Sequence, residues 1–233
     1  ERDNIQGERL NKQLTYWKYK LMGAPEVLNL SITKKRKNKS TSHGKHYNLN
    51  ISKDLCDTLH KTSEEKGVTR FVLLLAAYKL LLHNYSLEDK IVVGTPIANR
   101  SLEDTENLIG FFSNTLALCT DCSENPSCTE FINRTKQTVL ESYDYQDTPI
   151  DKVVEFLAKK RDLSHHPIFQ MWFAFHQEQN IKLELEGIEV ERVLLGNDVA
   201  KFDILLSIVE KEKNLSLYFQ YSDELFDEES IVE

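Results

Sequence analysis

The sequence predicts an α/β domain in which helices flank a mixed β-sheet. Stretches with apolar residues at helical spacing interchange with short alternating or wholly apolar stretches along the whole chain. Hydrophobic residues make up 40% and charged residues 28% of the 233 positions, which suffices for one substantial buried core. Because no internal repeat and no long linker interrupts this order, we expect one compact unit.

The first third of the chain predicts three helices and one strand. Leu10, Leu14 and Trp17 recur every three or four residues, which marks one face of a helix. The two later helices are indicated by Ser52 as an N-cap and by Gly67 as a stop between them. The expected elements are a helix at 7–21, a strand at 47–51, a helix from 52 to about 66 and a helix at 69–84.

The middle of the chain predicts two strands and two helices. Residues 91–95 form an apolar run closed by Pro96, which is the pattern of a strand covered on both faces. A polar segment at 99–107 then leads through a turn to a strand that ends at Leu118. The two helices, which follow this strand, are expected at about 129–143 and 150–160.

The end of the chain predicts three or four strands and the start of a helix. Runs of apolar and β-branched residues between polar turns indicate the strands. They are expected at 171–176, at 183–193 with a turn at Gly187, at 201–209 and at 215–221, and the helix begins at Asp227.

The charge pattern argues against nucleic acid as a partner. The formal net charge is -8, whereas a nucleic-acid binder presents a basic face. Basic residues do cluster at 34–45, but serine, threonine and glycine are interleaved with them, so we interpret this run as a solvated loop rather than a polyanion site. The acidic end at 223–233 is likewise interpreted as a solvated face.

No segment predicts a membrane anchor or a secretion signal. Residues 1–7 are polar and no apolar core follows them. The longest apolar run, 71–82, contains Lys79 and is too short to cross a bilayer of about 30 Å, so it predicts a buried helix. We therefore expect a cytoplasmic chain with no membrane partner.

The four cysteines predict neither a disulfide framework nor a metal site. Cys119 and Cys122 have the spacing of a zinc-ligand pair, with Cys128 as a possible third ligand. A structural zinc site needs four ligands, however, and no second pair with a suitable spacing exists in the sequence. We expect no bound metal.

The adjacent histidines His165 and His166 are candidates for catalysis or metal binding. A catalytic imidazole needs a partner, usually a carboxylate, that fixes its tautomer, and no acid follows in the next five residues. The favoured interpretation is a polar loop that enters a strand through Pro167. Nucleophile and phosphate-binding motifs are absent from the sequence, so no catalytic residue is identified.

Two polar residues interrupt otherwise apolar strand patterns. Alternation puts Asn114 on one face with Phe112 and Leu116, where an amide is costly unless it is hydrogen-bonded. Asn114 either ties a bulge or a neighbouring loop, or faces a cavity and holds an amide of a ligand. Asp203 raises the same question, and there a structural ion pair is favoured.

Four stretches together resemble the condensation domains of nonribosomal peptide synthetases. They occur in the order and at the spacing of that family and span nearly the whole chain. They are LTYWKYKLMGAPEVLNL at 14–30, VVGTPIANRSLEDTENLIGFFSNTLAL at 92–118, YQDTPIDKVVEFLAKKRDLSHHPIFQMWF at 145–173 and AKFDILLSIVEKEKNLSLYFQYSDELFDEESI at 200–231.

The resemblance implies that the histidine pair is not the family's catalytic HHxxxDG motif. That motif needs Asp and Gly where Gln170 and Met171 stand, and His165 falls where the family usually has an arginine. In the family the catalytic motif lies upstream, in the N-terminal half. The resemblance therefore implies that residues 1–233 are the C-terminal subdomain, that 1–30 lead in from the N-terminal subdomain, and that the chain is cut off in its C-terminal helix.

The resemblance also implies a fold, a reaction and partners. Such domains resemble chloramphenicol acetyltransferase, with two α/β halves in a V and a tunnel at their seam. The expected partners are the N-terminal subdomain, upstream and downstream carrier proteins and an adjoining adenylation domain. The carriers deliver substrates on phosphopantetheine arms, the acceptor amine attacks the donor thioester, and no cofactor is bound directly.

By the same resemblance, the strand after residues 110–112 runs beside the tunnel, which favours the cavity interpretation of Asn114. A need for glycine in the backbone is an equal explanation of Gly94. The implied tunnel residues are Gly94, Thr95, Ser113 and Asn114, and the implied structural residues are Arg100, Gln146 and Asp203. Two alternatives remain: a non-catalytic platform that docks carrier proteins, and a complete acyltransferase that uses His165 or His166.

Overall fold

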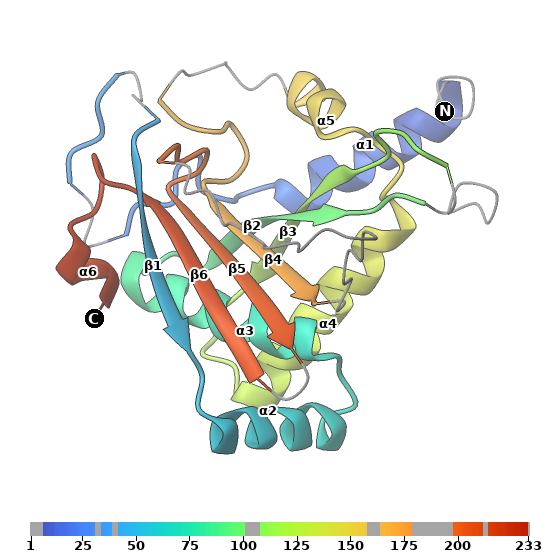
Figure 1. Cartoon of the computed structure of the whole chain (residues 1–233). Coiled ribbons are helices and arrows are strands. Elements are labelled where there is room, and N and C mark those ends of the chain that lie inside the picture. The colour runs from blue at the N-terminus through green and yellow to red at the C-terminus, as the bar shows by residue number, and fades with distance from the viewer. Residues whose placement is uncertain are drawn as a thin grey trace, which may run out of the picture.

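The computed structural model describes residues 7–30, 34–38, 42–100, 108–157, 164–178, 198–211 and 214–232. Six strands in these ranges form a mixed sheet in the order β1-β6-β5-β4-β2-β3, with helices around it (Figure 1). The elements are α1 (Gly7–Leu21), β1 (Gly44–Asn50), α2 (Lys53–Glu65), α3 (Arg70–Ser86), β2 (Lys90–Ile97), β3 (Asn114–Asp121), α4 (Cys128–Asp144), α5 (Ile150–Phe156), β4 (Met171–Gln177), β5 (Ile204–Lys211), β6 (Asn214–Ser222) and α6 (Glu228–Val232).

The sheet is parallel at its centre and antiparallel at its sides. β4 pairs in parallel with both β2 and β5, while the pairs β2–β3, β5–β6 and β1–β6 are antiparallel. Helices α3 and α4 lie behind the sheet in Figure 1, and α1 and α5 lie beside the ends of β2 and β3. This arrangement confirms the predicted α/β class with a helix-flanked mixed sheet.

Alternation along the strands separates a face that is packed on helices from a more open face. On β5, Ile204, Leu206 and Ile208 are buried while the residues between them are half-buried. On β4, the ring of Phe173 lies 5.4 Å from that of Phe71 and 6.0 Å from that of Tyr78, both on α3. The main core therefore sits between the sheet and the layer of α3 and α4.

Local sequence signals explain where the helices begin. The side chains of Ser52 and Thr69 accept hydrogen bonds from the amides of Leu55 and Val72, as expected of N-caps. In α4, Ser127 and Glu130 form a reciprocal capping box. Helix α1 has the predicted bounds 7–21.

The apolar run at 71–82 is a core helix, as predicted, and it buries one amine. Lys79 on α3 is fully buried, and its Nζ donates to the carbonyl oxygen of Leu118 at 2.8 Å and to the hydroxyl of Thr120 at 2.6 Å. Burial lowers the pKa of Lys79 to about 7. No helix in the described part of the chain is both long and apolar enough to cross a membrane.

Several expectations about elements need correction or stay open. Strand β2 does not stop before Pro96 but continues to Ile97. Helix α5 ends at Phe156, and residues 158–160 of the helix that was expected there lie outside the described residues. The strands expected at 183–193 also lie outside them.

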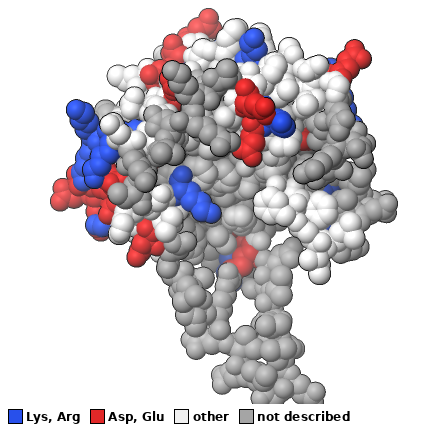
Figure 2. Space-filling model, turned by 90° about the horizontal axis from the view of Figure 1, so that it is seen from above, with Lys and Arg blue, Asp and Glu red and all other residues white. Residues whose placement is uncertain are grey.

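Most lysines of the basic run are exposed, but the basic run and the acidic end are not independently solvated as the sequence suggested. Lys37 pairs with Glu224 at 2.8 Å and Lys45 with Glu228 at 3.8 Å, and Lys34 pairs with Asp227. In Figure 2, which views the molecule from above relative to Figure 1, cationic and anionic side chains lie next to each other at one edge of the face shown. The two segments thus neutralise each other.

Candidate functional site

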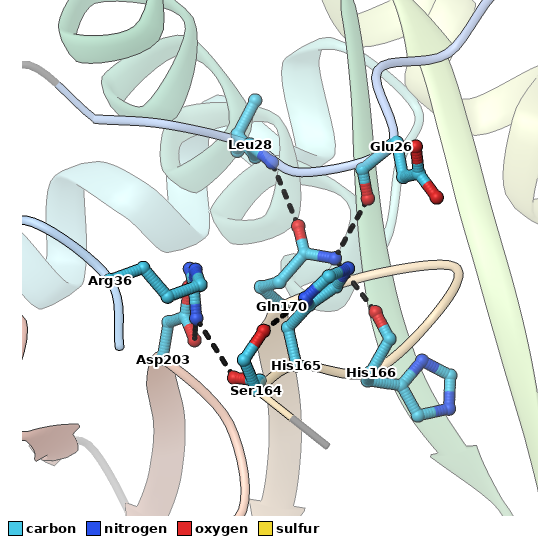
Figure 3. Close-up of polar contacts among 8 residues, drawn as sticks. All are labelled: Glu26, Leu28, Arg36, Ser164, His165, His166, Gln170 and Asp203. Atoms are coloured by element: carbon cyan, nitrogen blue, oxygen red, sulfur yellow. Dashed lines mark hydrogen bonds and ion pairs between the residues drawn. The ribbon is translucent and has the colours of Figure 1, made fainter. Parts of the chain in front are cut away.

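The histidine pair lies in the loop before β4, where several chain segments meet (Figure 3). The ring of His166 stacks on Phe169 with 4.1 Å between centroids, and its Nδ1 accepts from the amides of Ile168 at 3.3 Å and Phe169 at 3.4 Å. Burial lowers the pKa of His166 to about 4. The imidazole is therefore neutral near pH 7, and its acceptor nitrogen is occupied by the loop's own backbone.

His165 points into the same polar cluster and also contacts its own loop. Its Nδ1 lies 2.9 Å from the hydroxyl of Ser164. Within the described ranges, no group of three or more histidine, cysteine, aspartate or glutamate side chains could hold a metal ion. These contacts agree with the interpretation of a polar loop that leads into a strand.

Asp203, directly before β5, is buried and forms an ion pair of the kind expected, with the half-buried Arg36. Arg36 donates to both carboxylate oxygens, to Oδ1 at 3.0 Å, and also donates to the carbonyl oxygen of Ser164 at 3.2 Å. Burial raises the pKa of Asp203, and the bonds from Arg36 oppose that rise. The pair ties the segment before β1 to the loop before β4 (Figure 3).

Gln170 makes a second connection between these segments. Its Oε1 accepts from the amide of Leu28 at 2.8 Å, and its Nε2 donates to the carbonyl oxygens of Glu26 at 3.2 Å and His166 at 2.8 Å. The side chain is 2% exposed, so these bonds replace the water that it loses. Sequence reasoning missed this residue, although a glutamine inside an apolar run was a usable signal.

Asn114, at the start of β3, has its amide nitrogen fully used by the loop between α4 and α5. Nδ2 donates to the carbonyl oxygens of Gln146 at 2.8 Å and Thr148 at 2.9 Å. Oδ1 accepts from the amide of Thr115 at 2.8 Å. The geometry therefore agrees with the loop-tying interpretation, and Gln146 takes part through its backbone.

The same loop is fastened to α1. Trp17 Nε1 donates to the carbonyl oxygen of Tyr145 at 3.3 Å, and Thr148 hydrogen-bonds with Gln13. Arg9 pairs with Asp147 at 2.6 Å. Asn114 is thus part of a joint between α1, β3 and the loop after α4.

Gly94 and Thr95 on β2 face opposite sides of the sheet. The ring of Phe169 fills the space beside Gly94, and a Cβ there would overlap that ring. This contact agrees with the structural explanation of Gly94, that the backbone needs a glycine there. Thr95 is 2% exposed on the face covered by α3 and α4, and its hydroxyl has no hydrogen-bond partner among the described residues.

The segment before β3 is the exposed part of the expected site. Ser113 is exposed, Ile109 is fully exposed and Phe111 is 92% exposed. The guanidinium of Arg100 lies 4.3 Å from the centroid of the Phe112 ring, a cation–π contact. The four expected tunnel residues are therefore not on one surface, since only Ser113 is freely exposed.

Comparison with known proteins points to one family. The family model described as "Condensation domain" matches residues 1–233. A polypeptide of the linear gramicidin synthase of Brevibacillus parabrevis is 41% identical over 100% of this chain, and gramicidin S synthase 2 of Aneurinibacillus migulanus is 38% identical over 97% of it. The chain spans only 3% and 5% of the lengths of these two relatives.

Solved structures show the same fold. The X-domain from teicoplanin biosynthesis superposes with a TM-score of 0.90 at 24% identity, covering 98% of this chain and 53% of that one. The condensation domain of the Monacolin K polyketide synthase MokA superposes with a TM-score of 0.82 at 18% identity, covering 97% and 55%. The chain thus spans about half the length of these two structures.

Proposed function

The chain belongs to the condensation-domain family, and from this premise we propose that it takes part in amide-bond formation by a nonribosomal peptide synthetase. The amine of an acceptor aminoacyl thioester attacks the carbonyl carbon of a donor acyl or peptidyl thioester. The amide bond forms, the donor thiol leaves, and the lengthened chain stays on the acceptor carrier. The observation that carries this proposal is the family match over all 233 residues, together with relatives named as gramicidin synthases.

We further propose that the chain is the C-terminal half of such a domain. Three observations support this assignment: it spans 53% and 55% of two solved structures of the fold, its sequence contains no HHxxxDG, and it exposes Ile109 and Phe111. An N-terminal half would cover these apolar side chains and complete a passage for the phosphopantetheine arms. Upstream and downstream carrier proteins and an adenylation domain are the further partners.

The role proposed for this half is to shape and close the passage. Holding two tethered reactants in register lowers a barrier by up to roughly 7–11 kcal/mol through effective molarity. The half-buried, neutral His166 has its acceptor nitrogen occupied, so the proton acceptor is assigned to the other half. Ser113 is assigned to the wall, while Asn114 and Arg100 hold that wall in place.

Reconstitution tests the proposal. The chain, its matching N-terminal half and two loaded carrier proteins are mixed, and the carrier-bound product is measured by mass spectrometry. Product is expected only when both halves are present. Turnover by this chain alone, lost on replacing His165 or His166, would instead identify a complete acyltransferase.

The role of Asn114 has its own test in the reconstituted domain. Asn114→Ala removes both bonds to the loop after α4 and should slow condensation, because the wall beside it loses support. If condensation proceeds equally well, this assignment fails. A sequence upstream of Glu1 that lacks HHxxxDG would favour a docking platform for carrier proteins over an enzyme.

A further inference from the structure

A small hollow lies at the end of the sheet where β4 and β5 begin and β6 ends. Its volume is about 150 Å³, compared with about 30 Å³ for a water molecule in the liquid, so it admits a small ligand. Four segments that are far apart in the sequence line it, among them the loop that carries His165. Part of its lining, the Arg36–Asp203 pair beside Ser164, is drawn in Figure 3.

The charged side chains around this hollow give it a positive lining. Three are cations, Arg36, Lys37 and Lys201, and two are anions, Asp203 and Glu224. Each anion is already paired with one of the cations, since Asp203 binds Arg36 and Glu224 binds Lys37. Lys201 has no ion-pair partner among the described residues. An unbalanced cation thus faces the hollow, on a chain of net charge -8.

Some hydrogen-bond donors that line the hollow are not used by the other described residues of the protein and remain available to a ligand. Arg36 uses three of its five N–H groups on Asp203 and Ser164. The hydroxyl-bearing residue Ser222 lines the hollow as well. Because Asp203 fixes the guanidinium plane, binding a ligand there costs little ordering of the arginine.

We propose that this hollow binds a phosphate group, as inorganic phosphate or as the end of a small organic phosphate. The group lies between the Lys201 ammonium and the Arg36 guanidinium. A phosphate has enough acceptor oxygens to use several of these donors at once, and charge-assisted bonds to arginine and lysine are the strong ones. Phe202 and Leu225 form an apolar part of the wall that limits the size of what is attached. This site does not depend on the proposed condensation reaction.

Calorimetric titration of the intact chain tests the site. Inorganic phosphate, propyl phosphate and acetate are titrated at constant ionic strength, with chloride as the balancing anion. Saturable binding of one or both phosphates is expected, and the pattern distinguishes a free ion from an organic phosphate. Because Phe202 stacks on Trp172 with 4.7 Å between centroids, tryptophan fluorescence provides a second readout.

Two lysine variants supply the control. Lys201→Ala should weaken phosphate binding about tenfold, because one charge-assisted bond is lost. Lys53→Ala removes an exposed lysine on α2, at the opposite end of the sheet, and should leave binding unchanged. The proposal is overturned if neither phosphate gives saturable binding, if acetate binds as well as phosphate, or if Lys201→Ala binds phosphate like the parent chain.

Discussion

The amide of Asn114 illustrates how a single polar residue on an apolar strand face is stabilised. Its two N–H groups go to two carbonyl oxygens of one loop, and its oxygen takes the next amide of its own strand. The half-buried amide thus makes three hydrogen bonds within the protein in place of bonds to water. The residue therefore fixes the loop after α4 on β3.

Replacing this amide should destabilise the chain. Asn114→Ala leaves the carbonyl oxygens of Gln146 and Thr148 without their donor, so a loss of about 1–3 kcal/mol in the free energy of unfolding is expected. Urea denaturation measures it. Asn133→Ala, at an exposed position on α4, is the matched control and should change the value by less than about 0.5 kcal/mol. Equal effects of the two substitutions would contradict the role of Asn114.

Lys79 predicts a dependence of stability on pH. Its pKa is about 7 in the folded chain against 10.5 as the ordinary value, so folding disfavours its charged form. The free-energy cost of burying the charged amine is fully present below pH 7. It disappears as pH rises from 7 towards 10.5, because in this range the unfolded chain binds more protons than the folded chain. Lys79→Met should therefore stabilise the chain most at pH 6, and by less at pH 9.

This trend is measured by urea denaturation of the parent chain and the variant at each pH. Lys53→Met, at an exposed position on α2, is the control and should show no trend of the difference with pH. A difference between Lys79→Met and the parent chain that stays constant from pH 6 to pH 9 would show that the amine is not titrating in this window.

At the level of residues, the sequence predicted the kind of interaction better than the partner. Alternation indicated that Asn114 and Asp203 needed partners, but the partners are about 30 and more than 160 residues away in the chain. Such pairs depend on how strands and loops meet in space, which local pattern does not encode. For the same reason, the sequence alone did not distinguish Arg36, which forms an ion pair, from the exposed lysines next to it.

At the level of elements, periodicity and caps predicted most bounds to within a few residues. The bounds of helix α1 follow from spacing and the start of α2 from Ser52 as its N-cap, while Thr69, expected as the first residue of the next helix, is the N-cap of α3. Strand β2 was predicted too short because proline usually ends a strand. Here β2 pairs with β4 only at Val93 and Gly94. Pro96 therefore has no hydrogen-bonding partner on the β4 side, where its missing amide N–H would otherwise break the ladder.

In the loop before β4, the ring of Phe169 packs directly against Gly94 of β2. A methyl group at position 94 would overlap the ring, so Gly94→Ala should cost about 1–3 kcal/mol of stability. In a Phe169→Leu background the same substitution should cost less, because the smaller side chain leaves room. A double-mutant cycle by urea denaturation measures this coupling, and additive effects would argue that the two residues act independently.

At the level of the whole molecule, two large apolar side chains lie exposed beside each other on the segment before β3. Ile109 and Phe111 project from the segment before β3 and bury almost no area in this chain. An apolar patch of this kind favours association between molecules.

The double substitution Ile109→Ser and Phe111→Ser should therefore reduce self-association of the chain. Sedimentation at increasing protein concentration measures it. The free energy of unfolding should stay within about 0.5 kcal/mol, because neither side chain packs in the core. A large loss of stability would show that the segment is part of the fold itself, and unchanged self-association would show that another surface is responsible.

The neighbouring places of β1 and β6 in the sheet have a consequence for biosynthesis. β1 comes from residues 44–50, and its strand partner among the described strands is β6, at residues 214–222. During synthesis, at about 5–20 residues per second, β1 lacks this strand partner until residues 214–222 have emerged from the ribosome. For that interval the nascent strand offers unpaired backbone groups to any neighbour, and chaperone protection should matter most then.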